Sequence, residues 1–162
     1  CDLWMNSPAC GNMGVHAADH GKYLSAGSDQ GTGTSTSPTF VLPEGIDRIA
    51  FRRAGGAGAG SGVYLRRRND SRTLCFSESG EDTNAFFSDG CAGLESHEGE
   101  VVYLEIRDAQ RSSWGRVAVD AIRLLDSSGA ELSTGEAIWQ HAGEDCLPHC
   151  GKAGYCAWCG GG

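Results

Sequence analysis

Two aspartates near the end of a strand-rich region carry side chains suited to holding a cation. Asp120 and Asp108 supply carboxylate oxygens, which Ca²⁺ prefers as ligands. Asp120 also interrupts an apolar alternation, where a β-bulge would expose backbone carbonyl oxygens beside it. One interpretation is a structural calcium at Asp120 and Asp108, with further candidate ligands at Asp19, Asp29 and Asp126. The other is that the Asp120 carboxylate accepts hydrogen bonds from N–H groups of the bulge.

Trp114 precedes the last strand-like run in a Trp-Gly loop. An indole ring packs well against the CH groups of a sugar, while its N–H finds a polar partner. The alternative interpretation is a ring that covers one end of the fold. Trp114 is therefore a candidate ligand contact.

A run of three arginines, Arg66 to Arg68, follows Tyr64 in another strand-like segment. Guanidinium groups match the geometry of sulfate and carboxylate, so an anionic polysaccharide is one candidate ligand. The alternation predicts that Tyr64 and Arg66 face solvent. The predicted ligand-binding residues are thus Trp114, Arg66, Arg68 and Tyr64.

No arrangement of residues typical of catalysis is present in the sequence. His16 and His20 are four residues apart, but flanking glycines and the lack of a glutamate after His16 favour a loop. The glycine-rich residues 55–62 join two strand-like runs and lack the pattern of a phosphate-binding loop. No nucleophile elbow with matching histidine and acid is found. We expect the protein not to be an enzyme.

The elements that must position these residues are strands. Residues 39–42, 48–52, 63–66, 73–76 and 101–107 alternate with a period of two, and Gly, Asp, Asn and Ser separate them. The alternation places one set of side chains inward, namely Phe40, Leu42, Ile49, Phe51, Val63, Leu65, Leu74, Phe76, Val102, Leu104 and Ile106. Tyr103 and Arg107 then face outward. Such a core fits an antiparallel β-sandwich.

The closing strand is expected within residues 112–125. Val117 and Val119 share one face, whereas Ile122 and Leu124 continue on the opposite parity. A bulge near Asp120 would keep all four side chains buried.

Eight cysteines, clustered in the sequence, indicate disulfides and an oxidising, extracellular compartment. The preferred pairs are Cys1 with Cys10, Cys75 with Cys91, Cys146 with Cys156, and Cys150 with Cys159, although spacing alone leaves the pairing of the last four open. Asn69 opens an Asn-Asp-Ser triplet in a polar turn and is a candidate glycosylation site.

Charge and hydropathy limit the classes of partner. The net charge of −8 opposes non-specific nucleic-acid binding, and no run approaches the about 20 apolar residues of a membrane helix. Residues 46–75 hold seven arginines against two aspartates, whereas residues 76–108 hold one arginine against nine acids. These opposite charges either pair within the sandwich or join copies of the chain head to tail.

We predict two parts, a sandwich with an irregular N-terminal segment over residues 1–128 and a linker with a cystine-rich tail over residues 129–162. Because no leader precedes Cys1 and three glycines end the chain, we expect a processed or excised product of a longer protein.

Residues 21–126 resemble galactose-binding-like jelly-roll modules of secreted proteins. The resemblance rests on residues 37–43, 49–51, 101–108 and 114–122. It implies an all-β antiparallel jelly-roll sandwich, here with a short disulfide-rich C-terminal appendage, often with structural calcium and sometimes with a sugar site in the end loops. We therefore expect a non-catalytic extracellular module that recognises a glycan or matrix polysaccharide. The alternative is a structural subunit that assembles head to tail into an extracellular filament or matrix.

Overall fold

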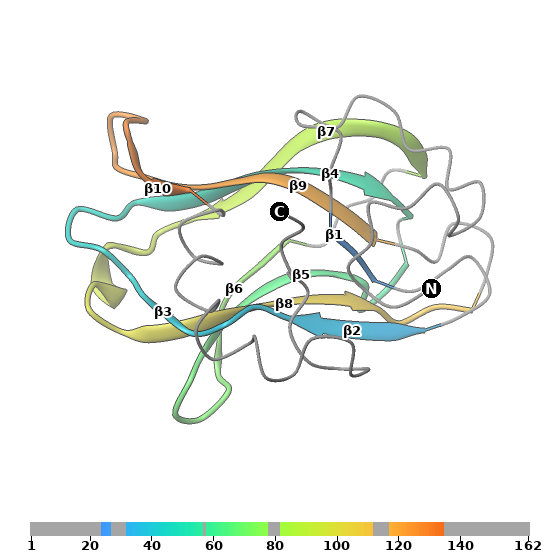
Figure 1. Ribbon diagram of the computed structural model, residues 1–162, viewed down its shortest axis with the longest axis horizontal. Coiled ribbons are helices and arrows are strands. Elements are labelled where there is room, and N and C mark those ends of the chain that lie inside the picture. Colours follow the sequence, from blue (N-terminus) through green and yellow to red (C-terminus); the bar gives the residue numbers. More distant parts are fainter. Residues whose placement is uncertain (1–23, 27–31, 57, 78–81, 112–116, 135–162) are drawn as a thin grey trace, which may run out of the picture.

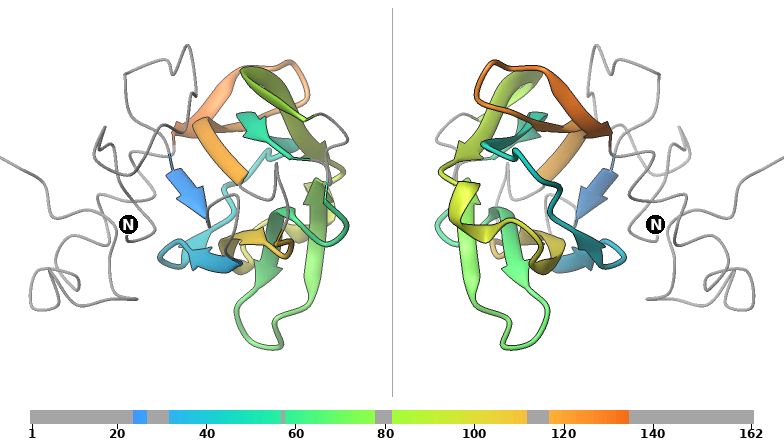
Figure 2. Two further views of the ribbon diagram at one scale, coloured as in Figure 1. Left: turned by 90° about the vertical axis from the view of Figure 1, so that its right-hand side faces the viewer. Right: turned by 90° about the vertical axis from the view of Figure 1, so that its left-hand side faces the viewer.

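The computed structural model describes residues 24–26, 32–56, 58–77, 82–111 and 117–134. They form two antiparallel β-sheets that pack face to face, as Figures 1 and 2 show. Apart from the short 3-10 turn η1 (Glu95–His97), no helix occurs in these ranges. The predicted two-sheet β-sandwich is confirmed.

The first sheet has the order β1-β9-β4-β7, with β10 also paired to β9. Its strands are β1 (Leu24–Ala26), β4 (Arg48–Gly55), β7 (Thr83–Ala92), β9 (Val117–Leu125) and β10 (Glu131–Thr134). Since β10 pairs with β9, the sheet continues past residue 128, where the sequence pattern ended the sandwich. Residues 127–129 form a turn in which the Asp126 carboxylate accepts the N–H groups of Ser128 and Ala130.

The second sheet has the order β2-β8-β5-β6, with β3 also paired to β8. Its strands are β2 (Gly33–Thr36), β3 (Phe40–Val41), β5 (Gly62–Arg67), β6 (Thr73–Ser77) and β8 (Val101–Asp108). The chain therefore changes sheet between β1 and β2, between β3 and β4, between β4 and β5, between β6 and β7, and between β8 and β9. Only β5 and β6 form a hairpin within this sheet, and the hairpin projects away from the two layers (Figures 1 and 2).

Alternating apolar side chains from both sheets form the core. The most deeply buried include Leu42, Ile46, Ile49, Leu65, Leu94, Val102, Leu104, Ile106, Val117, Val119 and Leu124. Burial of such side chains stabilises the fold by about 1.5–3 kcal/mol each. The predicted inward positions on β4, β5 and β8 are confirmed.

The predicted bulge in the closing strand is present. Ala50 pairs with Arg123 and Arg52 with Asp120, so Phe51 alone faces two residues of β9. Ala121, in the bulge, has a φ of 49°. The bulge restores the parity of the strand, and Val119 and Ile122 are both buried.

The prediction that Phe76 faces inward is wrong. Phe76 is 36% exposed, whereas its neighbour Cys75 is buried in the core. On β6, Cys75 pairs with the inward Leu65, whereas Phe76 pairs with Tyr64 on the opposite parity, and Leu74 is half-buried. Consequently Phe76 lies on the outer face of the second sheet.

Candidate functional site

The outer face of the second sheet carries a stack of planar groups. The rings of Tyr64 and Phe76, which are register partners on β5 and β6, lie 4.1 Å apart at an interplanar angle of 15°. Gly62 leaves room for this stack, because a Cβ there would lie 2.7 Å from Cε2 of Phe76. The Tyr64 hydroxyl donates to the carbonyl oxygen of Gly60 at 2.9 Å, which fixes the tyrosine.

Arg66 also packs on the ring of Tyr64. Its guanidinium carbon lies 4.6 Å from the centroid of the Tyr64 ring, within cation–π distance. Nε and Nη2 donate to the two carboxylate oxygens of Glu105 at 3.0 and 2.8 Å, and Nη1 donates to Oγ1 of Thr73 at 2.7 Å. Hydrogen bonding to Glu105 raises the pKa of the Arg66 guanidinium. The guanidinium therefore stays ionised, and the hydrogen bonds hold both side chains in position.

Two sequence-predicted ligand contacts, Tyr64 and Arg66, are thus brought together. The prediction that Tyr64 faces solvent is wrong, because the stack covers it and leaves it only 9% exposed. Arg66 is also less available to an external anion than its sequence suggested. Its side chain is 18% exposed and that of Glu105 is 15% exposed. Neither Phe76, which was predicted to face the core, nor Glu105 was predicted as a site residue from the sequence. The sequence did contain an indication for Glu105, because it shares the outward parity of Tyr103 and Arg107, and in the structure it lies opposite Tyr64.

The β5–β6 hairpin places the other arginines of the run. Arg67 donates from Nε to Asp70 at 3.0 Å and lies 3.6 Å from Glu100. Hydrogen bonds from the Arg67 side chain and the Arg72 backbone lower the pKa of Asp70 to about 2. Arg68 is exposed and has no ion pair with any residue in the ranges described. Asn69 is also exposed, at the tip of the hairpin.

Asp120 and Asp108, the candidate calcium ligands, are buried on strands of different sheets. Oδ1 of Asp120 accepts the N–H of Ala121 at 2.8 Å, and Oδ1 of Asp108 accepts that of Gln110 at 3.0 Å. The described residues contain no group of three His, Cys, Asp or Glu side chains able to hold a metal. Calcium remains a prediction from sequence, and the hydrogen bond at Ala121 agrees with the alternative interpretation of Asp120.

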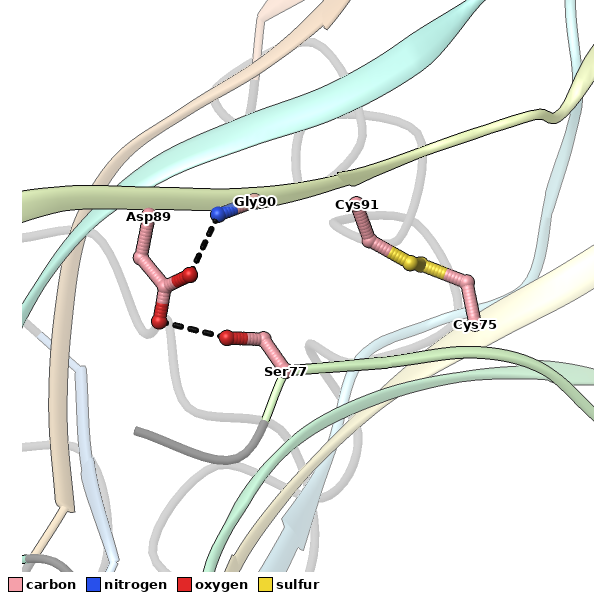
Figure 3. Close-up of a disulfide and its surroundings, with 5 residues drawn as sticks. All are labelled: Cys75, Ser77, Asp89, Gly90 and Cys91. Carbon is pink, nitrogen blue, oxygen red and sulfur yellow. Dashed lines mark hydrogen bonds between the residues drawn. A yellow bond between two sulfur atoms is a disulfide. The ribbon is translucent and has the colours of Figure 1, made fainter. Parts of the chain in front are cut away.

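The predicted Cys75–Cys91 disulfide is present, and it joins β6 of one sheet to β7 of the other. Figure 3 shows it beside a polar network at the same edge. There the hydroxyl of Ser77 donates to Asp89, whose other oxygen accepts the N–H of Gly90 at 2.7 Å. The disulfide and this network connect the two layers near the strands that carry the stack.

The buried Arg53 belongs to the same network, and the sequence analysis did not single it out. Its side chain is 1% exposed and lies 4.0 Å from Asp89. It donates to the carbonyl oxygens of Ser77 at 3.2 Å and Gly56 at 3.0 Å. Its burial could have been predicted, because Arg53 has the same parity on β4 as the inward Ile49 and Phe51.

Two carboxyl groups meet at the end of the sandwich. The pKa of Asp47 is raised, mainly by a hydrogen bond with Glu95 and to a smaller extent by burial and by the negative charge of Glu95. The segments that carry them are joined by a hydrogen bond from the N–H of Leu94 to the carbonyl oxygen of Asp47. Ionisation of Asp47 beside Glu95 therefore destabilises the folded state at neutral pH.

Several predicted features lie outside the described residues. They are Trp114, Asp19, Asp29, the histidines His16 and His20, and the pairs Cys1–Cys10, Cys146–Cys156 and Cys150–Cys159.

A comparison with protein-family models finds no match for this chain, and a comparison with curated proteins finds none either. Among the described residues there is no helix long and apolar enough to span a membrane.

Proposed function

We propose that this chain is a non-catalytic extracellular module that binds a glycan, with a jelly-roll sandwich of the galactose-binding-like kind as its scaffold. The observation that carries the proposal is the Phe76–Tyr64–Arg66 stack with its Glu105 partner on the solvent face of a sheet. The extracellular setting is supported by the Cys75–Cys91 disulfide, since such bonds persist in oxidising compartments.

The stack has the chemistry that a sugar requires. A sugar ring offers an apolar CH face and hydroxyl groups that both donate and accept hydrogen bonds. Phe76 supplies an exposed aromatic surface for the CH face. Arg66 donates and Glu105 accepts, and they lie side by side in fixed positions. Because the protein orders these groups before binding, the ligand need not compensate for ordering them.

Two further residues are proposed as ligand contacts. Arg68 is exposed at the start of the hairpin turn, where its N–H donates to the carbonyl oxygen of Val101 on the neighbouring strand at 2.8 Å. It would meet an acidic substituent of the glycan. Trp114 is included on its sequence context alone.

A glycan array followed by calorimetric titration tests this function. We expect the Phe76→Ala variant to lose at least about fivefold in affinity, since an aromatic contact contributes about 1 kcal/mol beyond its buried area. Leu132→Ala is the matched control, because Leu132 is 38% exposed and lies on β10 of the other sheet. Absence of binding to every glycan, with calcium present, would refute the proposal.

The second candidate is a structural subunit that assembles with copies of itself. The observation that favours it is a pair of exposed valines on the same outer face, Val41 and Val101, which are register partners and are 58% and 45% exposed. Against it, part of the opposite charge of the two segments is already paired within the sandwich, as Arg66 with Glu105 and Arg67 with Glu100.

Sedimentation at high protein concentration tests this second candidate. Assembly that the Val101→Lys variant abolishes, and that the Leu132→Lys variant retains, would support it. A monomer at all concentrations, with the Cys75–Cys91 bond formed, would exclude it.

A further inference from the structure

The tip of the β5–β6 hairpin combines an acceptor triplet with surplus positive charge. The chain contains four asparagines, and only Asn69 is followed by the pattern of any residue but proline and then Ser or Thr. Asn69, Asp70 and Ser71 are all exposed. The hairpin projects from the sandwich, so a large group attached there displaces nothing from the core (Figure 1).

Hydrogen bonds hold the backbone around the triplet and leave its asparagine side chain available. The N–H of Ser71 donates to the carbonyl oxygen of Arg67 at 2.9 Å, and that of Arg72 donates to Asp70 at 3.0 Å. The hydroxyl of Tyr103 donates to Oγ of Ser71 at 3.3 Å. The Asn69 side chain makes no hydrogen bond to another residue of the described ranges, so its modification breaks none of these contacts.

The charges on either side of Asn69 are only partly compensated. Arg67 is paired with Asp70 and Glu100. Arg68 and Arg72 are exposed and have no ion pair among the described residues. Two guanidinium groups are thus available to polyanions within three residues of Asn69, on a chain whose net charge is −8.

We propose that Asn69 carries an N-linked oligosaccharide and that this oligosaccharide screens Arg68 and Arg72 from polyanions. In the transfer, the Asn69 amide nitrogen bonds to the anomeric carbon of a lipid-pyrophosphate-linked oligosaccharide. The bond from that carbon to the pyrophosphate oxygen breaks, the lipid pyrophosphate leaves with the electron pair, and the amide loses one proton. The attached group is bulky and hydrated, and it begins one residue from Arg68. This inference does not depend on the stack of the sheet face, and it confines the proposed contact of Arg68 with an acidic substituent to chains in which Asn69 is unmodified.

Occupancy is tested on protein secreted from a eukaryotic cell line behind an added signal peptide, with cells and medium both analysed by mass spectrometry. The wild type should carry an added glycan mass that a peptide-N-glycosidase removes, converting Asn69 to aspartate. Asn69→Gln and Ser71→Ala should lose this mass, and Ser71→Thr should keep it. Asn84→Gln is the control for an asparagine outside such a triplet. An unmodified wild type with the Cys75–Cys91 bond formed would overturn the proposal.

Screening is tested with dextran sulfate as the probe. The unglycosylated Asn69→Gln protein should bind it about threefold to tenfold more tightly than the glycosylated wild type, because each exposed charge contact is individually weak. Adding Arg68→Ala and Arg72→Ala to Asn69→Gln should remove this gain, whereas adding the exposed Arg123→Ala should not. Equal binding by the two glycoforms would overturn the screening.

Discussion

Two arginine-centred networks occupy opposite environments in this sandwich. Arg53 on β4 is enclosed between the sheets and bonds mainly to backbone carbonyl oxygens, with Asp89 at 4.0 Å. Arg66 on β5 lies on an outer face, bonds to a carboxylate and stacks on Tyr64. The first network links the end of β4 to the end of β6, which belong to different sheets. The second holds ordered polar groups on an outer face. The environment of the guanidinium, more than its presence, separates the structural role of Arg53 from the binding role proposed for Arg66.

The largest expected effect is on the enclosed arginine. Arg53→Met should lower the free energy of unfolding by about 3–5 kcal/mol, because it leaves partners of a buried charge unsatisfied. Arg66→Met should lower it by about 1 kcal/mol, since that pair is partly exposed. Urea denaturation measures both values. Equal losses in the two variants would remove the distinction between the networks.

The disulfide beside Arg53 should have the next largest effect. Replacing Cys75 and Cys91 together by alanine should lower the free energy of unfolding by about 2–4 kcal/mol, since the bond closes a loop in the unfolded chain. The sequence separation of the two cysteines is 16 residues. Thermal denaturation of the wild type with and without reductant gives an independent measure. An unchanged midpoint would show that the polar network alone connects the layers.

A smaller effect is expected where Asp47 meets Glu95. The raised pKa of Asp47 means that the folded state binds a proton more tightly than the unfolded state. The free energy of unfolding therefore falls as the pH rises above the usual pKa of an aspartate. Glu95→Gln should raise the denaturation midpoint at pH 7 and flatten its decline between pH 4 and 7. The control is Glu98→Gln, which removes a nearby carboxylate bonded to the N–H of Gly45. A lower midpoint at pH 7 for Glu95→Gln would contradict the pairing.

The smallest effect is expected at the hairpin tip. Asp70 has its pKa lowered to about 2, so its stabilisation is complete above its usual pKa and is lost as the pH falls towards 2. Asp70→Asn should therefore differ from the wild type at pH 6 and converge with it near pH 2. Denaturation midpoints across this range provide the measurement. A difference that persists at pH 2 would show that the lost carboxylate charge is not its cause.

The sequence predicted the layers better than it predicted the outer face. Period-two alternation placed Ile49, Leu65 and Leu104 inward because burial on one face of a sheet enforces that period. It also required the bulge in β9, since Val119 and Ile122 have opposite parity. It failed at Phe76, because strand pairing places Cys75 opposite the inward Leu65 and Phe76 opposite Tyr64, and hydrophobicity alone does not reveal that pairing. The long strand β7 was missed because its residues do not alternate in hydrophobicity.

The most direct test of the proposed face is a titration of ¹⁵N-labelled protein with the glycan that binds most tightly on an array. We predict that amide resonances of β5, β6 and β8 shift first, centred on Tyr64, Phe76 and Glu105. Those of β4 and β9 in the opposite sheet should change little. Shifts confined to β4, β7 and β9, with none on the second sheet, would contradict the assignment of the site to this face.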